Sequence, residues 1–324
     1  MQIRLPAEWE KQSSIMVVFP TNHKDWQHSL KEIQKSYIEF INAIIKFQKC
    51  IVVCDKPDIL KNHLITTDNI EIYNIKTDDT WIRDFGPIDV YINGELKSYN
   101  FKFNAWGNKF QSSLDNNFNK YLCKKNLIDI DFILEGGSIE SNGDGVMLST
   151  SKCIFNANRN STYKPKDIEE KLATTFGLKK LIILKYGHLI GDDTDAHIDT
   201  LARFIDKETI AYAKCTDKND IHFNELLKME DELKKTGFKL VPLPLPSPIY
   251  FNNRRLPATY LNFVFINDAI IVPTYNDKND KKVLEILKKK IKNRKVIGVN
   301  SKVFIRENGS LHCSSINNFM LCVS

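Results

Sequence analysis

Short apolar runs and helical spacing alternate along the first part of the chain. Residues 16–20, Met-Val-Val-Phe-Pro, form an apolar run closed by proline, which is typical of a short buried strand. From Leu30 to Ile44 the apolar residues recur every three or four positions, which predicts an amphipathic helix of about five turns. Further apolar runs at 51–54 and 70–73 predict two more strands. Strand, helix and strand in this order indicate an α/β unit.

Turn signals later in the chain predict a series of hairpins. Asn93-Gly94 separates segments 88–92 and 96–103, and Asn-Gly between alternating segments is a strong hairpin signal. In the same way, segments 132–134 and 146–148 flank a turn at 142–145, and segments 260–265 and 269–272 flank Asn267-Asp268. Helical spacing falls between the hairpins, around 117–127, 167–176, 223–235 and 281–291. This rhythm recurs about five times without a repeated sequence, so we expect five small α/β modules around one axis.

The proline-rich segment 240–250 bears on domain organisation. Its prolines, at 242, 244, 246 and 248, suggest a linker, but the segment is too apolar for a solvated tether. We therefore expect an extended, buried segment. The prediction is a single domain over residues 1–324.

Composition excludes several classes of protein. The chain has 46 Lys and Arg against 40 Asp and Glu, but the excess is mostly Lys and forms no arginine cluster or nucleic-acid-binding motif. We expect no nucleic-acid partner. The seven cysteines are odd in number and form no C-x-x-C pair, which argues against a disulfide framework and favours a reducing compartment. With neither a signal-like N-terminus nor a long apolar run, the sequence predicts no membrane segment and a cytoplasmic location.

Four short stretches carry residues that could perform chemistry. Asp84 lies in Trp-Ile-Arg-Asp-Phe-Gly-Pro at 81–87, and Glu135 precedes Gly-Gly-Ser. His197 and Asp199 end Gly-Asp-Asp-Thr-Asp-Ala-His-Ile-Asp at 191–199, and Cys313 follows a histidine. Taken singly, each has a structural explanation, such as a turn cap, a loop charge, a hydrogen-bonded core histidine or a small buried hydrophobe.

Taken together, these residues suggest attack on a cation. They supply a thiol nucleophile, a histidine to move protons and three carboxylates. Metal binding is the rival interpretation, but the sequence has no calcium-loop, H-E-x-x-H or C-x-x-C pattern. A guanidinium ion fits such a set, because its paired N–H groups match carboxylate oxygens and its delocalised charge makes it a poor electrophile that needs a strong nucleophile and an acid.

Local geometry assigns the acid/base residue. His197 and Asp199 are two residues apart, so in an extended segment both point to the same face. If Cys313 lies on a strand and points into the site, His312 points away, which makes His197 the better acid/base. Trp81 and Trp106 are candidates for cation-π contact with the face of a bound cation. For Trp106, an ordinary buried tryptophan of the core is at least as good an explanation.

In this order the motifs resemble those of the agmatine deiminases. These are grouped with bacterial peptidylarginine deiminases in the guanidine-modifying, or pentein, superfamily, and the resemblance spans residues 5–313. It implies a five-bladed α/β propeller of pseudo-fivefold symmetry, with the active site on the central axis. It also implies hydrolysis of agmatine, a small-molecule substrate, to N-carbamoylputrescine and ammonia, on a route to putrescine. Neither metal nor organic cofactor is expected, and a homodimer is an open possibility.

The resemblance also implies a role for each site residue. Cys313 would be the nucleophile that forms an amidino-cysteine intermediate, and His197 the general acid/base. Asp84 and Asp199 would grip the guanidinium, and Glu135 would steady His197. The remaining assignments are to substrate binding: Trp81 and Trp106 would line the channel, and Asp193 is our choice for the distal amine.

A locally acidic pocket is also expected, because a basic protein that binds a dication needs one. Asp192, Asp193 and Asp195, beside Asp84 and Asp199, would supply it. One departure from the family concerns the nucleophile loop, where Asn-Gly-Ser precedes and Ser-Ser-Ile follows in place of Gly-Gly-Gly and Thr-Gln-Gln. The departure affects the loop that shapes the far end of the substrate.

Two alternatives remain open at this point. A peptidylarginine deiminase would need positive side chains for a peptide carboxylate, which Arg159, Arg254 and Arg255 leave available. A non-catalytic pentein that binds a partner is the other, although such a scaffold has no reason to keep a thiol, a base and paired carboxylates together.

Overall fold

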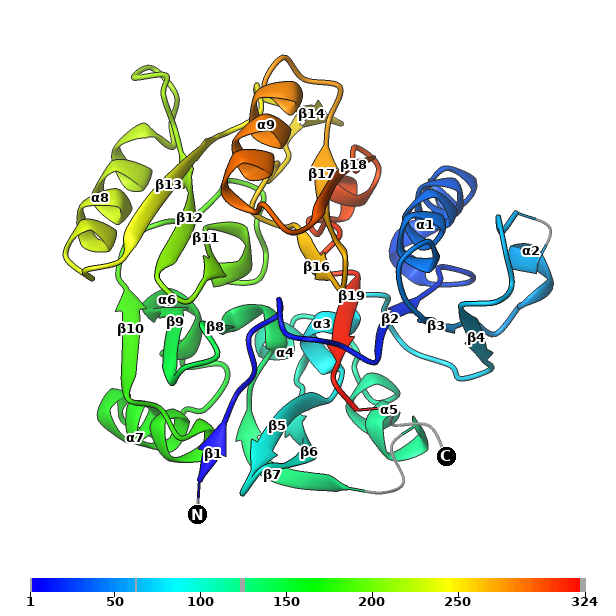
Figure 1. The fold of residues 1–324 in the computed structure, drawn as a ribbon, viewed down its shortest axis with the longest axis horizontal. Helices are drawn as coiled ribbons and strands as arrows, with labels where there is room; N and C mark the ends of the chain where they lie inside the picture. Colours follow the sequence, from blue (N-terminus) through cyan, green and yellow to red (C-terminus); the bar gives the residue numbers. More distant parts are fainter. Residues whose placement is uncertain (1, 62, 123–125, 321–324) are drawn as a thin grey trace.

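The strands assemble into several open sheets arranged around the middle of the molecule (Figure 1). The structure is a computed structural model that describes residues 2–61, 63–122 and 126–320. Within these ranges, strand pairing gives five sheets of three or four strands and one sheet of two, and none of them is closed.

The first sheet joins the two ends of the described chain. Its order is β19 (Ser315–Asn318), β2 (Ser14–Val18), β3 (Cys50–Val53) and β4 (Ile70–Tyr73). β2, β3 and β4 run parallel, and β19 runs antiparallel to β2. The helix α1 (Leu30–Ile45) connects β2 to β3 and buries its apolar face. β2, β3, β4 and the helix agree with the sequence prediction. The continuous apolar runs of β2 and β3, whose residues are all buried, are typical of strands covered on both faces.

The other larger sheets repeat one connection: an antiparallel pair, a helix and a parallel third strand. The sheet orders are β1 (Ile3–Arg4), β5 (Ile88–Ile92), β6 (Glu95–Lys102), β7 (Leu127–Ile133); β10 (Lys180–Leu184), β9 (Val146–Thr150), β8 (Glu140–Ser141); β11 (Ala202–Asp206), β12 (Thr209–Lys214), β13 (Lys239–Pro244); and β16 (Val264–Ile266), β17 (Ala269–Thr274), β18 (Lys295–Asn300). The connecting helices are α5 (Asp115–Leu122), α7 (Pro165–Phe176), α8 (Phe223–Lys234) and α9 (Asp280–Lys290). A two-stranded pair, β14 (Tyr250–Phe251) and β15 (Arg254–Arg255), stands apart.

Local sequence explains where these elements begin and end. In α7, Pro165 occupies the first turn, where a missing N–H costs nothing, and Gly177 ends the helix at φ 63°. The Asn93-Gly94 turn joins β5 to β6. Both residues have positive φ, which this type of hairpin turn requires and which asparagine and glycine adopt readily. The prolines of β13 are accommodated because β13 is an edge strand that pairs only with β12 in the described sheet.

One predicted hairpin is wrong. Residues 132–134 do not pair with 146–148; Phe132 belongs to β7, which runs parallel to β6, and the antiparallel partner of β9 is the short strand Glu140–Ser141. The other helices and strands that the sequence predicted agree with the structure to within a few residues. Residues 123–125 of the helix predicted around 117–127 lie outside the described ranges, and Leu127 begins β7.

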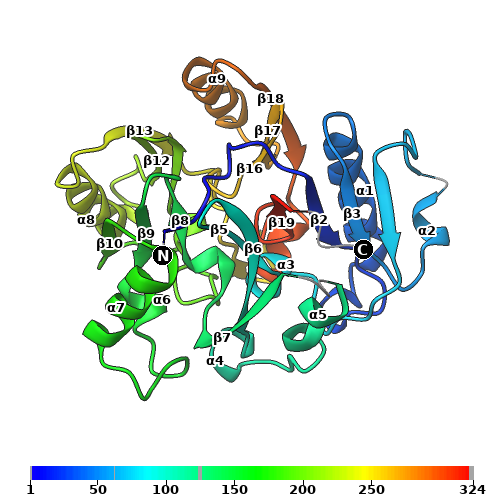
Figure 2. The same cartoon turned by 60° about the horizontal axis from the view of Figure 1, so that its bottom comes forward.

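Short elements occupy the middle of the molecule, where the site residues lie. They are α3 (Ile82–Phe85), α4 (Ala105–Asn108), α6 (Ser151–Ile154), η2 (Gly136–Ser138), η3 (Ile198–Thr200) and η4 (Phe304–Glu307). Two other short elements are α2 (Asp58–Lys61), which lies farther out, and η1 (Lys24–Trp26). The N-terminal segment runs across this region from β1 to β2 (Figures 1 and 2). Among the described helices, none combines the length and apolar character needed to cross a bilayer.

Candidate active site

A cavity of about 240 Å³ brings together five of the residues singled out in the sequence. They are Trp81, Asp84, Trp106, Asp193 and Cys313. The rest of its described wall is mostly polar and acidic: Asp25, Asp79, Phe110, Thr194, Arg254, Glu307, Asn308 and Gly309. His197, Asp199 and Glu135 do not line the cavity but lie buried directly behind it.

Cys313 lies in a turn, so the strand predicted for it is wrong. The turn covers residues 311–314, and β19 begins only at Ser315. Asn262 fixes this turn: its Oδ1 accepts the backbone N–H of Cys313 at 3.2 Å, and its Nδ2 donates to the Cys313 Sγ at 3.3 Å. Sequence reasoning did not identify Asn262, because a lone asparagine between apolar residues carries no signal by itself.

Asp84 contacts several of the other residues of the site. It sits in α3, where its Oδ1 accepts the Gly137 N–H at 2.9 Å and its Oδ2 accepts the Trp106 Nε1–H at 2.9 Å. Burial raises the pKa of Asp84, and the nearby His197 opposes that rise. Both carboxylate oxygens are therefore fixed in direction before any ligand binds.

His197 is fully buried between two carboxylates. Its Nδ1 lies 3.6 Å from Asp84 Oδ1, and its Nε2 lies 3.8 Å from Glu135 Oε2, so neither contact is a short hydrogen bond. Burial alone would lower the pKa of His197, but the negative charge of Asp84 raises it well above its usual value. The neighbouring carboxylates therefore favour the protonated form of the ring.

The backbone around His197 differs from the extended segment that the sequence predicted. His197 precedes the 3-10 turn η3, which contains Asp199, and the strand β11 begins later, at Ala202. The two side chains nevertheless approach one point. A Cβ added at Gly137 would lie 2.7 Å from His197 Nδ1 and 3.1 Å from Asp199 Oδ2. Gly137 is thus required where the site residues converge, a role that the Gly-Gly pair alone did not reveal.

Arg159 holds Glu135 in place. Its Nε lies 2.9 Å from both carboxylate oxygens of Glu135, and its Nη1 pairs with Asp195 at 2.7 Å. Burial alone would raise the pKa of Glu135, but contacts with His197 and Arg159 lower it below its usual value. Glu135 therefore stays ionised beside His197.

His312 does not point away from the site, as its expected place on a strand implied. Its Nδ1 lies 2.7 Å from Asp199 Oδ2, and its Nε2 lies 2.6 Å from Glu8 Oε1. Each ring nitrogen of His312 thus contacts one carboxylate. Burial alone would raise the pKa of Asp199, but the hydrogen bond from His312 lowers it. His312 thereby keeps Asp199 negatively charged 3.7 Å from the Cys313 sulfur.

Glu8 ties this pair to the N-terminal segment. It bonds Arg83 Nη1 at 2.9 Å and Arg203 Nη2 at 2.6 Å, in addition to His312. Arg203 is fully buried and also bonds Glu140. Because a buried charge without a partner is costly, removal of any one of these groups should destabilise the protein by leaving its partners unpaired.

The acidity of the cavity comes only in part from the residues predicted, of which Asp84 and Asp193 line it. Of the three aspartates at 192, 193 and 195, only Asp193 lines it; Asp192 accepts bonds from Thr194 and Ala196, and Asp195 pairs with Arg159. Further acidic wall residues are Asp25, Asp79 and Glu307. Burial and the charge of Asp25 raise the pKa of Glu307 to about 7 and that of Asp79 well above its usual value.

The thiol is poorly ionised without a ligand. Burial raises the pKa of Cys313 well above its usual value, and the charges of Asp199 and Asp84 raise it further. One oxygen of Asp199, Oδ1, is buried and has no hydrogen-bond partner among the described residues. A bound cation with N–H groups would therefore supply the hydrogen-bond donor that this buried oxygen lacks.

The fold is shared with a distantly related protein of known structure. The DDAH of Pseudomonas aeruginosa, in complex with citrulline, superposes with a TM-score of 0.53 at 11% identity over 95% of this chain and 99% of that chain, which shows a shared fold alone. The chain belongs to the Porphyromonas-type peptidyl-arginine deiminase family, whose model matches residues 4–318.

Two other relatives are much more similar to this chain in sequence. A C. jejuni agmatine deiminase, solved as a cysteine-to-serine variant with substrate bound, is 51% identical, with a TM-score of 0.96 over 98% of this chain and 97% of that chain. A curated protein of Marinomonas sp., provisionally named an agmatine deiminase, is 30% identical over 96% of this chain and 92% of its own length.

Proposed function

We propose that this protein hydrolyses the guanidinium group of agmatine to N-carbamoylputrescine and ammonia. The observation that carries the proposal is the convergence of Cys313, Asp84 and two tryptophans on one acidic cavity, with His197 and Asp199 directly behind it. The likeness to an agmatine deiminase with substrate bound supports it. A five-bladed α/β propeller formed by one domain over residues 1–324 is the corresponding proposal for the fold.

The residues divide the chemistry as follows. Asp84 and the free Oδ1 of Asp199 bind the guanidinium N–H groups and fix its plane. The Cys313 thiolate attacks the central carbon, and His197 gives its proton to the departing nitrogen, so that ammonia leaves and an amidino-cysteine remains. Water that has lost a proton to His197 then attacks that carbon and releases the ureido product with the thiolate. Glu135, fixed by Arg159, steadies the ring of His197 in both steps.

The pKa directions predict an alkaline pH profile. In the free enzyme both the Cys313 thiol and the His197 imidazolium keep their protons through neutral pH, since both pKa values are raised. Because kcat/KM reports the free enzyme, it should rise with pH as thiolate forms and fall only when His197 loses its proton. A profile that already falls near the ordinary histidine pKa of about 6.5 would contradict the assignment.

Substrate should ionise the thiol. A bound guanidinium places a positive charge beside Cys313, which favours the thiolate. We expect the ultraviolet absorbance of the thiolate to increase when a non-hydrolysable guanidine binds. A thiol equally ionised in the free and bound enzyme would exclude this part of the mechanism.

Asp193 is proposed to bind the distal amine of agmatine. It lines the cavity and accepts a bond from Asn308 at 2.9 Å, while burial raises its pKa in the absence of a cation. Asp193→Ala should raise KM for agmatine about 10- to 100-fold, the value of one charged hydrogen bond, with a smaller effect on kcat. Butylguanidine, which lacks the amine, is the control: its KM should not change. An equal rise of KM for both compounds would show that Asp193 does not bind the distal amine.

A peptidylarginine deiminase remains the second candidate because Arg254 lines the cavity. The other two arginines already have partners: Arg159 pairs with Glu135 and Asp195, and Arg255 pairs with Asp220 at 2.6 Å. Ammonia release should be measured from agmatine, free arginine and a blocked arginine ester, with a metal chelator present. Release from agmatine alone supports the first proposal, and release from the ester alone supports the second.

The cellular context is proposed on less direct grounds. The described cysteines at 50, 54, 153, 215 and 313 are all free, which fits a reducing cytoplasm. A place in putrescine synthesis would follow from the proposed product, and a homodimer is compatible with the sequence.

A further inference from the structure

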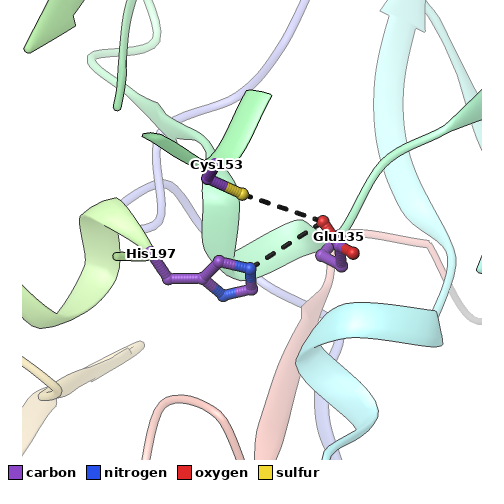
Figure 3. Close-up of side chains that lie close together, drawn as sticks. All are labelled: Glu135, Cys153 and His197. Atoms are coloured by element: carbon purple, nitrogen blue, oxygen red, sulfur yellow. Dashed lines mark hydrogen bonds and ion pairs between the residues drawn. The ribbon is translucent and has the colours of Figure 1, made fainter. Parts of the chain in front are cut away.

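A second thiol lies behind the candidate active site and has no part in the proposed mechanism. Cys153 belongs to the short helix α6, which Thr150 caps by accepting its N–H, and Cys153 is fully buried. Its sulfur lies 3.9 Å from Glu135 Oε2, on the side of Glu135 that faces His197 (Figure 3).

The three side chains have the geometry of metal ligands. One oxygen of Glu135, the sulfur of Cys153 and a nitrogen of His197 all lie within 4.8 Å of one another. His197 Nε2 is buried, has no hydrogen-bond partner among the described residues and faces this group at 3.8 Å from Glu135 Oε2. A tetrahedral zinc ion, bound at about 2.0–2.3 Å, separates its ligands by roughly 3.3–3.7 Å, so only small side-chain movements are needed.

We propose that Glu135, Cys153 and His197 bind a borderline-soft divalent cation such as Zn²⁺, and that this cation inhibits the enzyme. The ligand types favour zinc over Mg²⁺ or Ca²⁺, which prefer an all-oxygen shell. The effect on turnover rests on the proposed function; the binding itself does not.

The charges balance when the ion binds. Zn²⁺ displaces the thiol proton of Cys153 and the Nε2 proton of His197 to solvent, and water takes the fourth position. The ion then faces two negative ligands, Glu135 and the Cys153 thiolate. The positive charge of Arg159 beside Glu135 is matched by its ion pair with Asp195, and each Glu135 oxygen keeps a lone pair beyond its bond to Arg159.

Inhibition follows from the loss of a proton. With Zn²⁺ on Nε2, His197 cannot become an imidazolium and cannot protonate the departing nitrogen. All three ligands are at most 1% exposed, so the ion must enter a buried site. Inhibition should therefore develop slowly after mixing.

Binding is tested first without turnover. Titration of zinc chloride into Cys313→Ser should show one tight site, and Co²⁺ in the same variant should give a thiolate-to-cobalt absorption band. Both signals should disappear in Cys313→Ser/Cys153→Ala. Retention of the band in the double variant, or its absence from Cys313→Ser, would overturn the site.

Turnover then separates this site from the nucleophile. Cys153→Ala should keep kcat within about threefold of the parent. It should raise the inhibitory zinc concentration about 100-fold, because even residues that only support a metal ligand change metal affinity by about 10- to 100-fold when they are replaced. Cys50→Ala, which removes another fully buried thiol, is the matched control and should leave zinc sensitivity unchanged. Unchanged sensitivity in Cys153→Ala would place zinc on Cys313 instead. Failure of agmatine turnover in every variant would refute the proposed function and leave the binding result intact.

Discussion

Replacement of Cys313 by serine is expected to lower kcat for agmatine by roughly 10⁴- to 10⁶-fold, as loss of a catalytic nucleophile does in other enzymes. A serine hydroxyl keeps the volume and the bond from Asn262. However, its proton is far harder to remove than that of a thiol, and Asp199 and Asp84 oppose a second negative charge at this position. Substrate should still bind. Ammonia release and agmatine binding to the variant measure the two effects separately.

Cys50→Ser is the control for the general cost of a buried hydroxyl. Cys50 is fully buried in β3 and lies away from the cavity, so this variant should lose stability but keep its turnover per folded molecule. If Cys313→Ser turned over agmatine within tenfold of the parent, another group would have to be the nucleophile.

Asp84→Asn is expected to lower kcat/KM by about 30- to 5,000-fold, corresponding to about 2–5 kcal/mol for loss of one partner of a buried charged pair. Both oxygens of Asp84 accept from fixed donors, Gly137 N–H and Trp106 Nε1–H. An amide has only one acceptor, so whichever way it turns, its NH₂ group faces another donor. The variant also lacks the charge that binds guanidinium and supports the protonated His197.

Steady-state kinetics of Asp84→Asn should be compared with those of Asp89→Asn. Asp89 is likewise buried and accepts hydrogen bonds, from Ser98 and from the N–H groups of Phe319 and Met320, but does not line the cavity. Both variants should melt at a lower temperature, and only Asp84→Asn should lose activity. Equal kinetic losses would show that the effect is one of folding.

Local sequence predicted the elements better than the contacts between them. Apolar periodicity and turn residues depend on neighbours in the chain, so the long helices and about half of the strands were predicted. Of the residues that line the cavity, Trp81, Asp84, Trp106, Asp193 and Cys313 were predicted as site residues. The short turns at His197 and Cys313 were predicted as strands, because a few residues of mixed polarity fit either state.

The residues that were missed act across long distances in sequence. Asn262 contacts Cys313, and Glu8 contacts His312. Arg159 was noted only as a partner for a peptide carboxylate, because its contact with Glu135 depends on how separate sheets meet. Nothing in a single sequence brings Cys153 to His197 either. Such pairs follow from tertiary structure and are not encoded in local patterns.

The pairing of Glu8 with His312 also constrains how the protein can be made. During synthesis, Glu8, Arg83 and Arg203 leave the ribosome long before the histidine that completes their set, and β2 is complete long before β19, its partner. A nascent chain therefore carries charges that it cannot yet bury at low cost. The candidate site can form only after residues 312 and 313 have been translated, so a product cut short before His312 would have neither the nucleophile nor a stable place for these charges.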